Sequence, residues 1–220
     1  MSVSGSQIND NIVAGDGAAQ GGGGIFNAGG TLIVSDCSIN TNMTTGPSTS
    51  GGGILNDLGT LTVSNTELRG NAAIRAGGGI EDNSAMGSTL TLTTVVLEDN
   101  TTGASPGNGG GLHITGPGNS TISDCRVAGN AAASEGGGLW NGSGSMTVMG
   151  SIISGNTTMG ADANQGGAGL FNAGGTLLVD SCSINTNISS GTAASGGGIL
   201  NDMGTLTVVN SLISDNTAVR

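Results

Sequence analysis

The sequence has few aromatic side chains and little charge. Aromatic residues make up 1% of its 220 residues, tyrosine is absent, and charged residues make up 9%. A chain with so few large rings cannot build an ordinary globular core around them. Only four residues are basic, against 15 acidic ones, and the net charge of −11 repels nucleic acid and anionic membrane surfaces. We therefore expect neither of these as a partner.

Long apolar runs are also missing. No stretch approaches the roughly 18 apolar residues of a membrane helix, and no basic segment followed by an apolar one precedes the first repeat. We expect no membrane insertion by this segment, and we expect any export signal to lie outside it.

Glycine, by contrast, is abundant, with 45 residues. Such a content is typical of disordered or collagen-like chains. Disorder is a poor fit, because 35% of the residues are hydrophobic and the apolar ones alternate strictly with polar ones. Collagen would need a glycine at every third position, which this chain lacks.

The chain is built from one repeat, G-G-G-Φ-x-N-x-x-G-T-L-T-V-x-x-s-x-Φ-x-x-N-T, in which Φ is aliphatic and s is small. The third glycine of the repeat stands at Gly24, Gly53, Gly79, Gly111, Gly138, Gly169 and Gly198. A closing asparagine follows at Asn42, Asn71, Asn100, Asn130, Asn156, Asn187 and Asn216, and Asn11 matches it in an opening partial repeat. The distance from this glycine to the closing asparagine is 18 residues in five copies, 21 in the third and 19 in the fourth. From the asparagine to the next such glycine it varies between 8 and 13, which indicates loops.

Within each repeat the apolar residues recur at every second position, which predicts strands. Three short strands per coil predict an all-β fold: a right-handed, single-stranded parallel β-helix, a three-faced solenoid of about seven coils. We expect one solenoid domain over residues 1–220 that is a segment of a longer protein.

The closing asparagines are expected to stack as a ladder along the solenoid, each bonding backbone groups and the neighbouring amide. All three cysteines occupy one small inward position, as Cys37, Cys125 and Cys182. Coils lie about 4.8 Å apart, so even the nearest two cysteines are too distant for a disulfide. We expect buried free thiols.

Two outward rows are candidates for function. The residue after the inward aliphatic one forms an outward row that is mostly apolar: Phe26, Leu55, Glu81, His113, Trp140, Phe171 and Leu200. We interpret this apolar stripe as a row covered by loops or as a partner-binding surface, whose contact residues would be Phe26, Leu55, His113, Trp140, Phe171 and Leu200. The partner would be a protein, a glycan or a second copy of the chain. The other row is rich in threonine and is similar to the flat face of solenoid ice-binding proteins: Thr31, Thr60, Thr62, Thr89, Thr91, Thr121, Thr147, Thr176, Thr205 and Thr207. Ile33 and Leu178 interrupt it.

A catalytic site is not expected. Polysaccharide lyases and glycosidases need two or three carboxylates on adjacent coils, often with a basic residue. The basic residues are scattered, and the best acidic cluster is Glu81 and Asp82 with Asp57, which could hold a cation weakly. We predict no catalytic residues, no cofactor and no metal, and we keep a polysaccharide-binding or polysaccharide-cleaving β-helix as a third alternative.

The G-G-[G/A]-Φ strand paired with a Φ-x-x-N turn resembles the repeat of bacterial polymorphic outer membrane proteins and autotransporter passenger domains. Here the motifs stand as Gly52-Gly53-Ile54 with Leu68-Arg69-Gly70-Asn71, and they recur in every coil. The chain departs from that pattern in having Ile, Leu or Val where many members have Phe. The resemblance implies an extracellular or bacterial cell-surface protein that serves as an adhesin or as a structural spacer.

Overall fold

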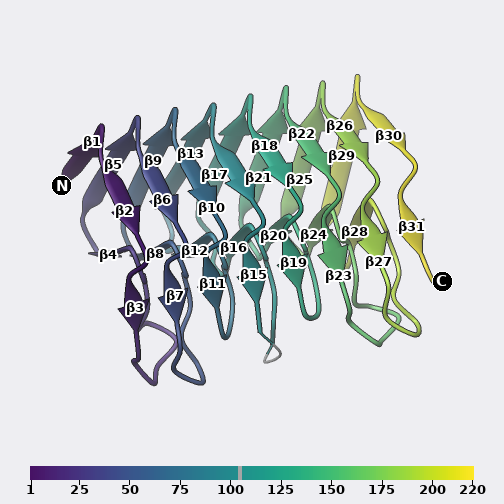
Figure 1. Cartoon of the computed structure of the whole chain (residues 1–220). Helices are drawn as coiled ribbons and strands as arrows, with labels where there is room; N and C mark the ends of the chain where they lie inside the picture. The colour runs from purple at the N-terminus through teal and green to yellow at the C-terminus, as the bar shows by residue number, and fades with distance from the viewer. Residues whose placement is uncertain (104–105) are drawn as a thin grey trace.

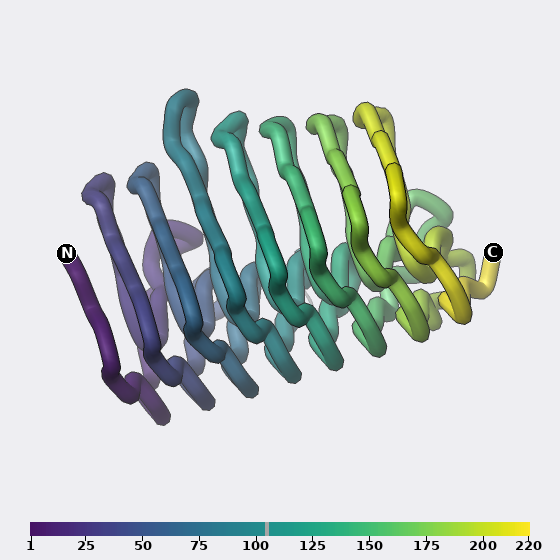
Figure 2. The backbone as a smooth tube through the Cα atoms, turned by 90° about the horizontal axis from the view of Figure 1, so that it is seen from above, coloured from purple at the N-terminus to yellow at the C-terminus, as the bar shows by residue number. Residues whose placement is uncertain are grey.

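The alternating residues of each repeat form parallel strands that stack coil on coil. We describe the fold from a computed structural model, which covers residues 1–103 and 106–220. Each complete coil contributes one strand to each of four sheets, and every strand pairs in register with its counterpart one coil away (Figure 1). Viewed from above, the coils stack one after another along a single axis from the N-terminus to the C-terminus (Figure 2).

The first strand of each complete coil follows the glycine triplet, and these strands form what we call the glycine sheet. Its members are β4 (Ile25–Ala28), β8 (Ile54–Asp57), β12 (Ile80–Asn83), β16 (Leu112–Ile114), β20 (Leu139–Asn141), β24 (Leu170–Asn172) and β28 (Ile199–Asn201). The next strands form the threonine sheet: β1 (Ser2–Ser4), β5 (Thr31–Ser35), β9 (Thr60–Ser64), β13 (Thr89–Thr93), β17 (Asn119–Ser123), β21 (Ser145–Met149), β25 (Thr176–Asp180) and β29 (Thr205–Val209).

A corner separates the threonine sheet from what we call the middle sheet. Its strands are β2 (Gln7–Asn9), β6 (Ser38–Asn40), β10 (Glu67–Arg69), β14 (Val96–Glu98), β18 (Arg126–Ala128), β22 (Ile152–Ser154), β26 (Ser183–Asn185) and β30 (Leu212–Ser214). After the closing asparagine comes the short sheet: β3 (Ile12–Val13), β7 (Met43–Thr44), β11 (Ala72–Ala73), β15 (Thr101–Thr102), β19 (Ala131–Ala132), β23 (Thr157–Thr158), β27 (Ile188–Ser189) and β31 (Thr217–Ala218).

The parallel β-solenoid of about seven coils is confirmed, with one addition. The repeat predicts three strands per coil and loops after each closing asparagine, but a fourth strand of two residues forms there. Two residues are too few to show an alternating pattern, so periodicity could not reveal this strand.

The core is a column of stacked aliphatic side chains. Leu61, Val63 and Leu68 of one coil are fully buried, as are their counterparts Leu90, Leu92 and Leu97 in the next. The three cysteines are free and buried, as expected. Burial raises the pKa of the Cys125 thiol to about 11 and also raises the pKa of Cys182, so neither thiol is activated as a nucleophile.

The closing asparagines form the expected ladder. Asn71, for example, donates from its backbone N–H and from Nδ2 to Oδ1 of Asn100, at 3.0 and 2.9 Å. Asn100 repeats both bonds to Asn130, and its Nδ2 also donates to the carbonyl of Leu68 in the preceding coil at 2.9 Å. The same pattern runs from Asn11 to Asn216, so each junction between coils contains a polar clamp, which is buried between Asn42 and Asn187 and part-buried at the two ends.

Candidate functional site

The apolar stripe on the glycine sheet is mostly covered, so the expectation of an exposed contact surface is wrong for much of it. Leu55 and Glu81 are fully buried, and His113 and Phe171 are 2% exposed. Trp140 and Leu200 are half-buried, and Phe26 is the one member that is well exposed, at 47%. Whether these residues bind a partner stays a prediction, but they do not offer a continuous open surface.

The chain covers the stripe by doubling back before each glycine triplet. The residues at the start of this bend form a further row of parallel bridges, including Asn108 to Glu135 and Glu135 to Gly166. At Gly109 and Gly136 the backbone has positive φ and lies against the stripe, where an added Cβ would come within 2.5 Å of His113 Cβ and 2.9 Å of Trp140 Cβ. Glycine is required there both for the backbone conformation and for the close approach.

Beneath the bend the aromatic rings of His113, Trp140 and Phe171 pack against one another. The Trp140 ring lies 4.3 Å from that of His113 and 5.9 Å from that of Phe171, nearly parallel to the latter. Its Nε1 donates to Glu135 Oε2 at 3.0 Å. An indole with both faces occupied cannot serve as a flat platform for a sugar or a peptide.

Beside these rings lies a buried ionic group. His113 Nδ1 is 2.8 Å from Glu81 Oε2, and Arg75 is 3.6 Å from the other Glu81 oxygen. Thr115 Oγ1 donates to Asn83 Oδ1 at 2.9 Å and lies 3.4 Å from Glu81. Among the described residues this is the place where ionisable side chains replace the apolar or amide side chains of the repeat, and we treat it as the candidate site.

The predicted acidic cluster of Asp57, Glu81 and Asp82 does not form. Glu81 and Asp82 are successive strand residues, so their side chains lie on opposite sides of β12. Glu81 contacts His113, whereas Asp82 accepts a hydrogen bond from Asn56 Nδ2 at 2.6 Å. Nowhere in residues 1–103 and 106–220 do three His, Cys, Asp or Glu side chains gather in a way that could hold a metal ion.

Asp82 belongs to a second asparagine ladder, which is not among the features predicted from the sequence. Asn27 donates to Asn56 at 2.6 Å, and Asn141 donates to Asn172 and Asn172 to Asn201 at 2.8 and 2.6 Å. The repeat contains this asparagine directly after the outward residue. Its recurrence at that position in most coils is the sequence signal from which the second ladder could have been predicted. The ladder is interrupted where Asp82 and then Ile114 take its place.

The buried position of Asp82 in that ladder changes the pKa of its carboxyl group. Burial is the main cause that raises its pKa to about 6, from an ordinary 3.8, and the nearby Glu81 carboxylate adds to the effect. The Asn56 bond opposes the shift. Asp82 is therefore a buried carboxyl group that titrates close to neutral pH.

The threonine row is in register, as the repeat implies. Thr62, Thr91, Thr121 and Thr147 are direct neighbours across four successive strands. These four are half-buried, as is Thr60, while the others are exposed: Thr31, Thr89, Thr176, Thr205 and Thr207. Ile33 and Leu178 interrupt the row, as the sequence shows.

Two of the basic residues are less scattered than expected. Arg69 and Arg126, on the outer face of the middle sheet, both pair with Glu98, Arg126 at 2.7 Å. Arg69 also bonds Glu67 at 2.9 Å, and this bond is the main cause that lowers the Glu67 pKa. The arrangement is a surface ion-pair network that links three coils.

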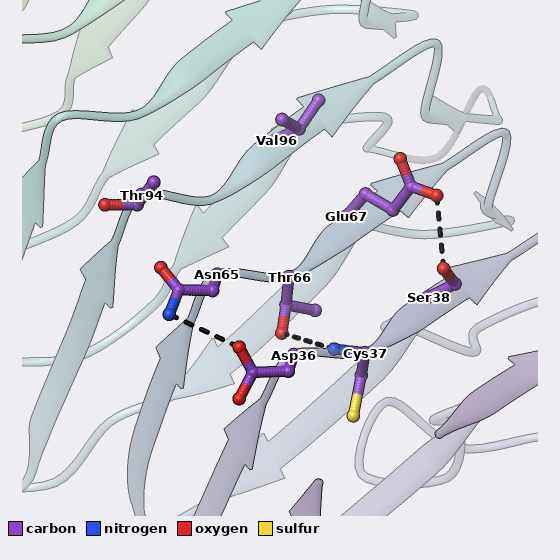
Figure 3. Close-up of a pocket in the computed structure, with 8 residues that line it drawn as sticks. All are labelled: Asp36, Cys37, Ser38, Asn65, Thr66, Glu67, Thr94 and Val96. Atoms are coloured by element: carbon purple, nitrogen blue, oxygen red, sulfur yellow. Dashed lines mark hydrogen bonds between the residues drawn. The ribbon is translucent and has the colours of Figure 1, made fainter. Parts of the chain in front are cut away.

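A hollow of about 520 Å³ lies at the corner between the threonine and middle sheets, lined by Asp36, Cys37, Ser38, Asn65, Thr66, Glu67, Thr94 and Val96 (Figure 3). Its polar groups bond one another. Ser38 Oγ donates to Glu67 at 3.1 Å, and Asn65 Nδ2 donates to Asp36 at 3.4 Å. The hollow is the space between stacked corner residues, and its side chains are not arranged around a common ligand position.

Comparison with known proteins gives one result. A family model described as a right-handed β-helix region matches residues 59–219. No curated protein and no solved structure matches the chain. Among the residues that the structure describes, no helix is long and apolar enough to span a bilayer.

Proposed function

Because the chain belongs to the right-handed β-helix family, we propose that it is a non-catalytic solenoid module of an exported bacterial surface protein, acting as an adhesin or as a structural spacer. The observation that carries this proposal is the division of each coil into a fixed part and a variable part. Four in-register sheets and a buried ladder hold the coils together, and variation in length is greatest at the edge between the short sheet and the glycine sheet.

The variable edge is the best-placed contact surface. The connection between β11 and β12 spans only residues 74–79, whereas the one between β23 and β24 spans 159–169. The loops at the lower side of Figure 1 project from this one edge. Exposed connections on a rigid scaffold tolerate sequence change and are common binding surfaces, and a protein or glycan ligand fits the proposal.

Two measurements test this proposal. Antibodies against the chain should label intact cells of the source organism, and external protease should remove the signal. Beads coated with the chain should bind a panel of host proteins or glycans. Replacing residues 159–165 by residues 133–134, the corresponding part of the shorter connection before β20, should reduce binding while the far-UV circular dichroism stays unchanged. Labelling only after the cells are broken would reject the proposed location, and binding unaffected by every loop exchange would reject the proposed surface.

Ice binding by the threonine sheet is a second candidate. One observation favours it: the outward residues of these strands include a single charge, Asp180, although the protein carries a net charge of −11. Neighbouring hydroxyls repeat at about 4.8 Å across strands and about 6.6 Å along them, which is a flat, regular array. Changing Thr62 and Thr91 to Lys should abolish thermal hysteresis, with Thr101→Lys on the short sheet as the control. Absence of hysteresis in the unaltered protein would remove this candidate.

Catalysis is the least supported alternative. Glu81 is sealed beneath the bend, and Asp82 lies on the other side of its strand. A polysaccharide-cleaving β-helix would instead show activity on a panel of polysaccharides that is lost in a Glu81→Gln, Asp82→Asn variant. Any such loss would overturn the proposal that the module is not an enzyme.

A further inference from the structure

The junction between β12 and β16 differs from the other junctions of the glycine sheet in its polar contacts. The second ladder is broken there, because Asp82 pairs in register with Ile114, which has no polar group. One coil further on, Asn141 Oδ1 is buried and has no hydrogen-bond partner. The amide clamp present at β4–β8, β20–β24 and β24–β28 is therefore missing at β12–β16, and also at β16–β20, where Ile114 pairs with Asn141.

On the other side of the same two strands, a contact between two buried polar side chains joins the coils. Glu81 on β12 and His113 on β16 are neighbours in register, 2.8 Å apart, and both are buried. Arg75, in the connection before β12, lies 3.6 Å from Glu81. On the next coil Glu135 bonds the Trp140 indole that lies against the His113 ring.

Asp82 is the buried acidic group on the ladder side of this junction. It is 2% exposed, it accepts a hydrogen bond from Asn56 Nδ2, and Ile114 on the next coil offers it no side-chain donor. Its neighbour on the same strand, Glu81, is a nearby group of like charge. An ionised Asp82 therefore places a negative charge beside an apolar side chain, and protonation of Asp82 removes that charge. Groups that face Asp82 from the adjoining strands, Asn56 and Ile114, carry no charge.

We propose that the junction between β12 and β16 is a proton-dependent joint, which holds more tightly in mildly acidic solution than in neutral or alkaline solution. Uncompensated charge in a buried site is costly, and the charge on Asp82 arises as the pH rises. The pKa of Asp82, raised to about 6 by burial, supports the direction, because the closed junction then binds this proton more tightly than an opened one. The inference does not depend on the proposed function.

The junction between β20 and β24 is the matched control. It lies in the same sheet and has the same backbone pairing, but it joins Leu139, Trp140 and Asn141 to Leu170, Phe171 and Asn172. None of these side chains titrates near neutral pH. Its amide clamp, from Asn141 to Asn172, is intact at 2.8 Å.

Hydrogen exchange of single amides, followed by NMR at pH 5.5 and pH 8.0, tests the joint. The N–H groups of Ile80 and Thr115 donate across the β12–β16 junction, and those of Leu139 and Ala173 donate across the β20–β24 junction. After correction for intrinsic exchange, protection of the first pair should fall at least about tenfold relative to the second pair as the pH rises, since one pKa unit corresponds to a factor of ten.

The variant Asp82→Asn keeps a side-chain oxygen that accepts from Asn56 Nδ2 but removes the titrating carboxyl group. In this variant the ratio of the two protections should not change with pH. An unchanged ratio in the unaltered protein overturns the proposal without any variant. So does a change of ratio that persists in the folded variant.

Discussion

Replacing Asn100 by alanine should destabilise the protein far more than a like change at the end of the ladder. Asn100 Oδ1 accepts two hydrogen bonds from Asn71, one from its backbone N–H and one from Nδ2. Asn71 and Asn100 are both fully buried, so water cannot replace the lost acceptor. Each buried donor left without a partner costs about 1–3 kcal/mol, which gives a loss of about 2–6 kcal/mol in the free energy of unfolding.

Asn11→Ala is the matched control. The Asn11 side chain is exposed and donates to Asn42 Oδ1, and its backbone N–H makes the same contact and remains after the change. No buried donor is left without a partner, and the loss should not exceed about 1 kcal/mol. Equilibrium urea unfolding followed by circular dichroism measures both variants. Equal losses for Asn100→Ala and Asn11→Ala would refute the reasoning that the buried ladder holds the coils together.

Three further predictions concern buried groups. Asp82 has a pKa of about 6 in the folded chain against an ordinary 3.8, so its contribution to stability is largest below pH 3.8 and is lost as the pH rises to about 6. Two pKa units correspond to about 3 kcal/mol. Asp82→Asn should therefore raise the free energy of unfolding by up to about 3 kcal/mol at pH 7.5 and by little at pH 4. A gain in the free energy of unfolding that does not depend on pH would contradict this prediction. Ile114→Asn adds an amide that can donate to Asn141 Oδ1, and in the Asp82→Asn background it completes the ladder. The loss of unfolding free energy caused by Ile114→Asn should therefore be at least about 1 kcal/mol smaller in that background than in the unaltered chain. Additive effects of the two changes in denaturant melts would argue against a continuous ladder. Cys125 is 3% exposed and its pKa is raised to about 11 by burial, so all labelling by a thiol reagent at pH 8 should require unfolding, and rapid labelling of the folded protein would show that the site opens.

Most of the fold could be predicted from the repeat. The inward residues, such as Leu61 and Val63, identify themselves by strict alternation, and the spacing of Asn71 from Asn100 identifies the ladder. These features depend on contacts between equivalent residues of adjacent coils, so a repeat in sequence translates directly into a repeat in space.

The candidate site could be predicted only in part. Alternation correctly placed Glu81 and His113 on the outer side of their strands, but it carried no information that the chain doubles back over that side. Burial there depends on the path of the connections, which vary in length and have no periodic pattern. The second ladder was readable in principle, because Asn56, Asp82 and Ile114 occupy one column of the repeat.

Buried asparagine side chains bond coil to coil throughout the solenoid, and side-chain hydrogen exchange in protein labelled with ¹⁵N-asparagine tests this most directly. We predict slow exchange for the Nδ2 protons of the fully buried ladder residues Asn42, Asn71, Asn100, Asn130, Asn156 and Asn187. We predict immediate exchange for the exposed Asn119 and Asn164. Exchange of all asparagine side chains at the rate of the exposed ones would contradict it.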